Sequence, residues 1–476
     1  MILFVFILSF VLSFGILYCA RRYLARGRLS VGDTFFHLLV SDSIQKQKWK
    51  FPSSLHNVIF SEIDKNFNYL AYPPLFHYII ALFPLKFHQK IAKYFSLVIL
   101  SFVSSLTAIF IYDLTLNLGF AILSSFIVIF NFSALSLVVN FSPRSLGLFF
   151  YSLVVSIVIF YPENFFSLFG IGLLVTLISL THKFALQTLF FGFMTYVFLF
   201  GKPYFLLSFV FGFLLSIFVS RGFFLKILKE HINWLYFYKS RPQRTHIITN
   251  LSAIFGRNIW ALQIVISILF VLFQNNDSLF ESLLKTDLFT KVVFWSFINV
   301  LLALLVSIPN LSFLGEYYRY LEYSVVSIGI ATSLLMVYLS PYILLVSFTC
   351  ISISLLVLMK YRRHLVHSKA LVDPDDILSY YSLRDYNLSN LLVFPGARTL
   401  EVRYYSKISV IHPVRGPETP VEHITNLTNN YEIRYVLKFK DNDPYQLFAT
   451  MTNMKKMEKI ADFANFELYK INQEND

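Results

Sequence analysis

Asp33 and His37 stand one helical turn apart in the run GDTFFHLLVSDSI, which closely follows the first hydrophobic segment. Residues four apart share a face of a helix, so a carboxylate and an imidazole would point the same way. A carboxylate at a low-dielectric boundary has a tunable pKa, which suits a general base. Asp33 is equally suited to be the N-cap of a surface helix, which needs no catalytic function. We expect a helix near Asp33, with Asp33 as a candidate base and His37 as a candidate substrate contact.

Arg319 lies between two glutamates in the run GEYYRYLEY, three residues after Glu316 and three before Glu322. A helix would hold the guanidinium between both carboxylates. An arginine fixed in this way presents paired donors to a phosphate or a pyrophosphate. The other interpretation is an ordinary salt bridge within one helix. We treat all three residues as candidates for substrate binding.

Arg144, in the run SPRSLG, and the neighbours His182 and Lys183 are further candidates for phosphate contact, because they lie at short joints between apolar segments. Arg144 is also compatible with a snorkelling arginine at a membrane interface. The residues after it, LGLFFYS, offer no acidic ligand. The sequence therefore identifies no metal ligands. It leaves the cofactor unknown, and a divalent metal remains one of the options.

The composition indicates a polytopic membrane protein. Of the 476 residues, 56% are hydrophobic and only 14% are charged, whereas soluble domains carry about 25% charged residues. The mean hydropathy is +0.62. We expect membrane lipids as surroundings and no nucleic-acid partner, although the net charge is +13.

About eleven apolar segments are long enough to cross a bilayer, if each span needs ~20 residues. We predict an all-α polytopic membrane domain over residues 1–360 and a small soluble α/β domain over residues 361–476. In the latter, three runs have the pattern of strands and Met454–Ala464 has that of an amphipathic helix. The predicted spans are 2–20, 89–112, 119–140, 144–161, 164–181, 184–200, 203–220, 258–274, 289–308, 320–339 and 341–359; the predicted strands are Asn390–Pro395, Arg434–Phe439 and Phe466–Ile471.

The first long loop, 21–88, contains the run YPPLFHYIIALFP, from Tyr72 to Pro84. Prolines interrupt this run at its start and end it, and at about 11–13 residues it is too short to span a bilayer. It predicts a juxtamembrane or re-entrant helix. With eleven spans, this loop, all the candidate residues above and the C-terminal domain fall on one face. Such asymmetry suits an enzyme with one working surface better than a channel or carrier, which needs polar groups near the midplane.

An acidic residue just outside the first membrane helix, followed by a Pro-Pro juxtamembrane helix, resembles the start of the GT-C class of membrane glycosyltransferases. SPRSLG is similar to the Arg-Ser element in the second external loop of oligosaccharyltransferase catalytic subunits. The chain as a whole distantly resembles these subunits and the aminoarabinose and mannosyl transferases. The resemblance covers roughly the first 360 residues. It implies transfer of a hexosyl or pentosyl group from a polyprenyl-phosphate carrier to a lipid, glycan or protein acceptor. It also implies Asp33 as the base that activates the acceptor and Arg319 as the main phosphate ligand.

Two arguments disagree about which side of the membrane the working face lies on. The positive-inside rule indicates the cytoplasm, because four arginines closely follow the first span. GT-C enzymes work on the external or lumenal side, and a basic face also serves an anionic lipid phosphate. We therefore predict an external active face in the plasma membrane. The alternative function is a lipid-carrier flippase or transporter without chemistry. The four arginines are Arg21, Arg22, Arg26 and Arg28.

Overall fold

The computed structural model divides the chain into two compact units. The first unit comprises Met1–Arg26, Pro73–Phe76 and Tyr94–Leu365, and the second comprises Gly27–Tyr72, His77–Lys93 and Val366–Asp476. Much of the predicted first loop is thus grouped with the C-terminal part, and the two-domain division at residue 360 stays a prediction. The structure describes residues 1–30, 33–50, 72–161, 163–239, 259, 264–265, 287–339, 342–367, 371–386, 388, 391–394, 398–408, 410–411, 433–440, 448, 451–452 and 457–471.

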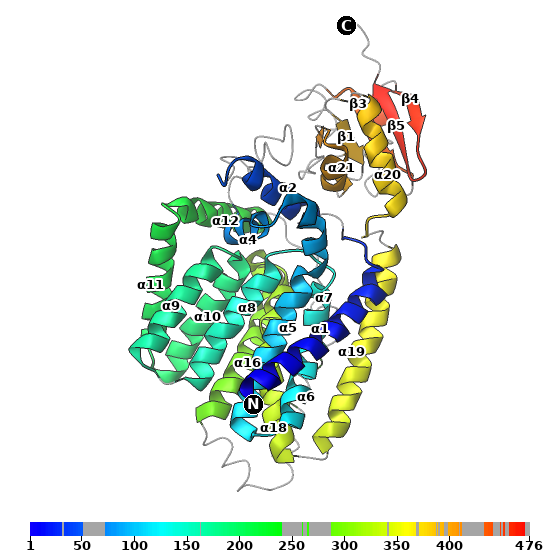
Figure 1. Ribbon diagram of the computed structural model, residues 1–476. Helices are drawn as coiled ribbons and strands as arrows, with labels where there is room; N and C mark the ends of the chain where they lie inside the picture. Colours follow the sequence, from blue (N-terminus) through cyan, green and yellow to red (C-terminus); the bar gives the residue numbers. More distant parts are fainter. Residues whose placement is uncertain are drawn as a thin grey trace. The chain divides into compact units, whose positions relative to one another are not determined.

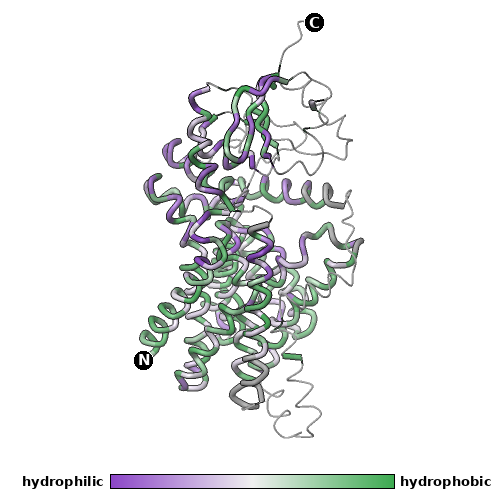
Figure 2. Tube along the Cα trace, turned by 90° about the vertical axis from the view of Figure 1, so that its right-hand side faces the viewer, coloured by the Kyte–Doolittle hydropathy of each residue, from purple (hydrophilic) through white to green (hydrophobic). Residues whose placement is uncertain are grey.

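The first unit is a bundle of helices (Figure 1). Most of these helices are hydrophobic along their length (Figure 2). They are α1 (Ile2–Ala25), α5 (His88–Thr115, from Tyr94 on), α6 (Leu118–Ile129), α7 (Phe132–Leu137), α8 (Arg144–Phe160), α9 (Phe165–Ser179), α10 (Lys183–Phe200), α11 (Tyr204–Val219), α12 (Phe223–Lys239), α16 (Asp287–Val306), η2 (Pro309–Leu314), α17 (Tyr317–Glu322), α18 (Val325–Leu339) and α19 (Tyr342–His367, up to Leu365). The start of α5 and the preceding turn η1 (Leu85–Phe87) belong to the second unit.

Every predicted apolar segment contains a helix, except 258–274, which lies almost entirely outside the described residues. Four described helices are long and apolar enough to cross a membrane: α1, α5 with η1, α10 and α16. The number is five if α11 and α12, which meet at an angle of 114°, form one broken span. Several other apolar helices are shorter, and the count of about eleven spans stays a prediction.

Glycines bring the helices of the first unit close together. A Cβ atom on Gly212 of α11 would lie 2.2 Å from the carbonyl oxygen of Gly172 on α9. The carbonyl oxygen of Gly212 accepts a hydrogen bond from Thr176 Oγ1 of α9 at 3.0 Å. Small residues allow such close approach between membrane helices, where dispersion and hydrogen bonds hold the helices together.

The second unit contains a five-stranded mixed sheet with strand order β2-β1-β3-β5-β4. Strands β2, β1 and β3 are parallel, and β5 runs antiparallel to both β3 and β4. Buried side chains from three of these strands, Leu392, Val436 and Ile471, belong to one hydrophobic core. The predicted strands coincide with β1 (Leu391–Phe394), β3 (Tyr435–Phe439) and β5 (Phe466–Ile471); the other elements are β2 (Val410–Ile411), β4 (Met457–Asp462), α20 (Pro374–Ser382), η3 (Leu383–Tyr386) and α21 (Thr399–Ser406).

The helix predicted over Met454–Ala464 is wrong. Its described part forms strand β4, which pairs antiparallel with β5. Lys459 Nζ lies 2.8 Å from Glu467 Oε1 across this pair. The prediction failed because β4 has no alternation of buried and exposed residues, so its apolar residues are equally compatible with a helical period.

The two helices predicted in the first loop are present. Helix α2 (Asp33–Lys46) begins at Asp33, and α4 (Leu75–Ala81) begins directly after Pro74 and ends before Pro84. The prolines explain both limits of α4, because proline fits the start of a helix and cannot continue one.

Candidate functional site

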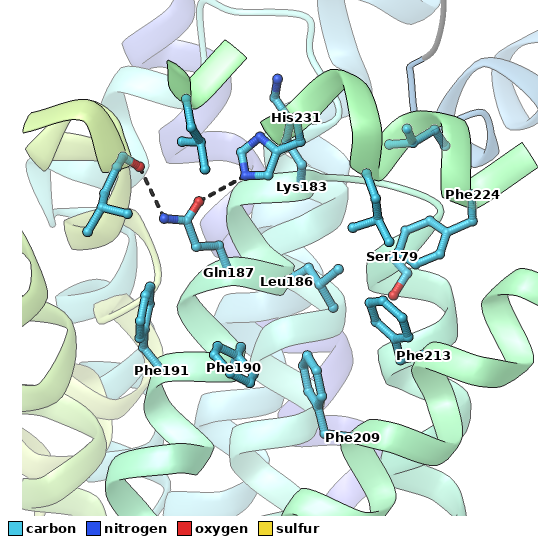
Figure 3. Close-up of a pocket in the computed structure, with 14 residues that line it drawn as sticks. Ser179, Lys183, Leu186, Gln187, Phe190, Phe191, Phe209, Phe213, Phe224 and His231 are labelled. Atoms are coloured by element: carbon cyan, nitrogen blue, oxygen red, sulfur yellow. Dashed lines mark hydrogen bonds between the residues drawn. The ribbon is translucent and has the colours of Figure 1, made fainter. Parts of the chain in front are cut away.

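An apolar pocket of about 300 Å³ lies between α9, α10, α11 and α12. Figure 3 shows Lys183, Gln187 and His231 together at one part of its wall, with the phenylalanines elsewhere. Such a pocket, mostly apolar with a few polar groups, is typical of a ligand site. The lining residues are Ser179, Lys183, Leu186, Gln187, Phe190, Phe191, Phe209, Phe213, Phe224, Ile227, Leu228, His231, Leu235 and Leu314.

Lys183 belongs to a junction where the N-termini of α8 and α10 meet. Arg144 is the first residue of α8, His182 is the N-cap of α10, and Lys183 is the first residue of α10. Gly147 permits the contact, because a Cβ atom there would lie 2.9 Å from His182 Cβ. Neither helix has an acidic residue in its first turn. The partial positive charges of the two helix ends therefore add to those of Arg144 and Lys183.

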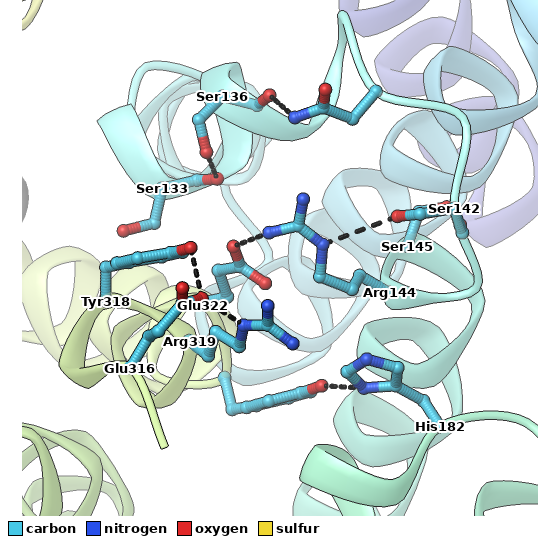
Figure 4. Close-up of polar contacts among 12 residues, drawn as sticks. Ser133, Ser136, Ser142, Arg144, Ser145, His182, Glu316, Tyr318, Arg319 and Glu322 are labelled. Carbon is cyan, nitrogen blue, oxygen red and sulfur yellow. Dashed lines mark hydrogen bonds and ion pairs between the residues drawn. The ribbon is translucent and has the colours of Figure 1, made fainter. Parts of the chain in front are cut away.

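Arg319 is held by Glu316 and by an aromatic ring. Its Nε donates to Glu316 Oε2 at 2.6 Å, and the Tyr318 hydroxyl donates to the same oxygen (Figure 4). Its guanidinium lies 4.6 Å from the centre of the Phe184 ring on α10. Burial alone would lower the pKa of Arg319, but the charge of Glu316 raises it above its ordinary value. The guanidinium is therefore always charged, and no described residue accepts from its two terminal amino groups.

The prediction that both glutamates flank Arg319 is only half right. Glu322 pairs instead with Arg144, at 2.9 Å between Oε1 and Nη1. Long side chains on a helix lean toward its N-terminus, so Arg319 leans toward Glu316 and away from Glu322. The side chain of Glu322 is 3% exposed and that of Arg144 is 15% exposed. The pair thus connects α17 to the N-terminus of α8.

Tyr323 and Gln187 belong to this site and were not found in the sequence. The hydroxyl of Tyr323 lies 2.7 Å from His182 Nδ1, and this hydrogen bond fixes the imidazole ring. Gln187 lies one turn after Lys183 and bonds to Leu314, Tyr320 and His231. The position of Tyr323 at the end of GEYYRYLEY was the only signal for it. Nothing in the sequence around Gln187 marks it.

Asp33 and His37 lie in the second unit. They are one turn apart on α2, as predicted, but only the side chain of Asp33 is exposed. His37 is 3% exposed, and its Nδ1 lies 2.9 Å from Nε2 of His77, which is also buried. A third buried histidine of this unit, His88, binds Asp42 Oδ1 at 2.6 Å. The expectation that the carboxylate and the imidazole point the same way is not met, because the side chain of His37 packs inward against His77.

Within the described part of the chain, no three or more histidine, cysteine, aspartate or glutamate side chains are close enough to hold a metal ion. The requirement for a divalent metal stays open.

No model of a known protein family matches the sequence, and no curated protein matches it. Several solved structures match the fold. One is ArnT from Cupriavidus metallidurans bound to undecaprenyl phosphate, with a TM-score of 0.62 and 10% identity over 97% of each chain. The apo state of the same protein gives a TM-score of 0.63 and 11% identity over 98% of this chain and 97% of that one. The oligosaccharyltransferase AglB from Archaeoglobus fulgidus, in complex with an inhibitory peptide and a dolichol-phosphate, gives 0.54 and 10% identity over 94% of this chain and 70% of that one. The chain therefore has a GT-C-like glycosyltransferase fold.

Proposed function

We propose that this protein is a membrane glycosyltransferase that takes a hexosyl or pentosyl group from a polyprenyl-phosphate carrier. The observation that carries the proposal is the position of Arg319 and Lys183, which ties a cationic cluster to an apolar pocket in the first unit. A lipid phosphate combines a phosphate with an apolar chain, and this site offers a partner for each. The GT-C-like fold supports the same function.

In this proposal, Arg319 is the main phosphate ligand. Its two terminal amino groups would bind two phosphate oxygens, and paired charge-assisted hydrogen bonds are among the strong polar contacts. Arg144 and Lys183 would add positive charge at the ends of α8 and α10. Glu316 and Glu322 would act on the substrate indirectly, since each already holds an arginine.

His182, which Tyr323 holds at Nδ1, would add a polar contact to the phosphate beside Lys183. The apolar pocket would take the part of the prenyl chain nearest the phosphate. At about 300 Å³ the pocket lies at the low end of the range for ligand pockets, and the remainder of a long chain would stay in the bilayer.

Asp33 would be the base. An acceptor hydroxyl or amine attacks C1 of the sugar, the new bond forms there, and the C1–oxygen bond to the carrier phosphate breaks. The proton of the acceptor passes to the Asp33 carboxylate, and the polyprenyl phosphate leaves with the bonding electrons. The exposure of the Asp33 side chain supports this role. His37 would position α2 through His77 and make no direct contact with the substrate.

The reaction would take place on the external face of the plasma membrane, with a lipid, glycan or protein as acceptor. The resemblance to GT-C enzymes, which work on the external or lumenal side, supports this face, and the basic site suits the phosphate of a carrier lipid.

The proposal is tested by purifying the full chain from membranes and identifying, by mass spectrometry, the lipids that co-purify. We expect a polyprenyl phosphate, with or without its sugar, and its loss in the variant Arg319→Ala. A matched control is Arg362→Ala, because Arg362 also stacks on a ring, 4.3 Å from the centre of Tyr23, but has no role in the site. A sugar-phosphate carrier bound equally by both variants would refute the site. Bound carrier without any transfer to added acceptors would support the flippase instead.

A further inference from the structure

Gln187 connects the pocket to the segment that carries Arg319. Its Nε2 donates to the carbonyl oxygen of Leu314 at 3.1 Å and to the hydroxyl oxygen of Tyr320 at 2.8 Å. Its Oε1 lies 3.2 Å from Nε2 of His231 and accepts that N–H. Figure 3 shows Gln187 at the wall of the pocket, with its amide turned toward His231. The amide thus uses both of its hydrogens and one lone pair to join three separate elements.

The three partners of Gln187 lie on three elements, α12, η2 and α17. His231 lies on α12, which forms one wall of the pocket. Leu314 ends η2, and Tyr320 lies next to Arg319 on α17. The Tyr320 hydroxyl also donates to the Leu314 carbonyl, at 3.0 Å. The hydrogen bonds among Gln187, Leu314 and Tyr320 therefore hold the end of η2 and the start of α17 in one fixed arrangement.

Phe184, one turn before Gln187 on the same helix, supports the same connection. Its ring packs edge-on against His231, with 6.0 Å between the ring centres. Arg319 lies over the ring at 4.6 Å. Gly315, with φ +126°, lies so close that a Cβ atom there would be 2.4 Å from Phe184 Cε1. A movement of the α12 wall would thus reach Arg319 through Phe184 and Gln187.

We propose that Gln187 is a positioning residue that makes the apolar pocket and Arg319 act as one binding site. A chain in the pocket holds α12 in place, α12 holds Gln187 through His231, and Gln187 holds the Leu314–Tyr320 turn so that Arg319 faces the phosphate. The inference rests on the proposed function, because it takes a polyprenyl phosphate as the ligand.

The consequence is that chain binding and phosphate binding are coupled. A long carrier gains affinity from the pocket and also from a correctly placed Arg319. A carrier with a single isoprene unit cannot fill the pocket and gains less from Arg319. Without Gln187, the two contributions become independent.

The test uses Gln187→Met, which has a similar volume and removes all three hydrogen bonds. The control Thr188→Val changes the next residue of the same helix, which is buried and whose hydroxyl donates to the Phe184 carbonyl of its own helix. The probes are undecaprenyl phosphate and dimethylallyl phosphate, titrated against the full chain in detergent. For Gln187→Met we expect undecaprenyl phosphate to bind about tenfold more weakly, equal to about 1.4 kcal/mol. Dimethylallyl phosphate should lose less than about threefold, and Thr188→Val should bind both probes like the wild type.

Kinetics separate positioning from general damage. With a sugar-loaded carrier, Gln187→Met should raise KM for the donor and leave kcat and the acceptor KM unchanged. Arg319→Lys should cost less in the Gln187→Met background than in the wild type, since coupled residues are not additive. Gln187→Glu, which keeps the acceptor for His231 and loses both donors, should show the same donor effect. It serves as the second variant if Gln187→Met does not fold.

The outcomes distinguish the two ideas. If the wild type binds neither probe, the proposed function fails. If the wild type binds undecaprenyl phosphate and both Gln187 variants bind it equally well, the function stands and the inference is overturned. Additive losses for Gln187→Met and Arg319→Lys, or equal losses for both probes, would also overturn it.

Discussion

Replacement of Arg319 by lysine keeps the charge and removes the geometry. In the structure the Nε of Arg319 is occupied by Glu316, and its flat guanidinium lies on Phe184. Two terminal amino groups are left for the phosphate. A lysine in Arg319→Lys has a single ammonium group, which would be shared between Glu316 and the phosphate, and it has no planar fork.

The loss is worked from these contacts. One charge-assisted hydrogen bond to the phosphate is worth about 1.5–3 kcal/mol, or roughly ten- to a hundredfold in affinity. The weaker stacking on Phe184 adds about 0.5 kcal/mol. We therefore expect Arg319→Lys to bind a polyprenyl-phosphate sugar at least about tenfold more weakly than the wild type.

The assay is a titration of the lipid-linked sugar against the full chain in detergent. Arg362→Lys is the matched control, because Arg362 stacks on Tyr23 in the same unit. If Arg319 only makes a salt bridge, lysine still pairs with Glu316 and donor binding barely changes. Equal affinities of Arg319→Lys and wild type would refute the phosphate role.

The other predictions concern the base, the face and the helix junction. Asp33→Asn should abolish transfer while donor binding and folding in membranes persist, because an amide cannot accept the acceptor's proton; normal turnover would eliminate Asp33 as the base. A cysteine introduced at Asn426 should react with a membrane-impermeant thiol reagent in intact cells; labelling only after lysis would place the C-terminal part inside. Gly147→Ala should weaken donor binding severalfold, because the new methyl group would lie only 2.9 Å from His182 Cβ and would push His182 aside. The control Gly170→Ala, whose new methyl group would lie 3.9 Å from its nearest neighbour, should bind the donor normally.

Hydropathy was enough to predict most helices, because long apolar runs in a membrane protein form helices that satisfy their own backbone groups. The limits of α4 followed from Pro74 and Pro84 for a local reason, since proline acts on its own turn. Strand β4 was missed because its hydrogen bonds come from β5, and a partner strand leaves no period in the sequence.

The sequence was enough to pick out the cationic residues of the candidate site, but not the hydrogen bonds and ion pairs that join them to other elements. Arg144, Lys183 and Arg319 stood out as rare charges between apolar segments. The pairing of Glu322 with Arg144 was not predictable, since the two residues are far apart in the chain and only the fold brings the end of α17 to the start of α8. Gln187 was missed for the same reason: an uncharged residue inside an apolar run acquires its meaning only from three partners brought together by the fold.

The ion pair between Arg144 and Glu322 also constrains how the protein is made. The two residues are 178 positions apart in the chain. At about 5–20 residues per second, a ribosome needs roughly 10–35 s to travel from one codon to the other. During that interval the predicted span α8 would enter the membrane before the carboxylate of Glu322 has been synthesised. We expect nascent chains cut before α17 to keep this arginine at the lipid headgroups and to be held by insertion factors until the second half of the pair emerges.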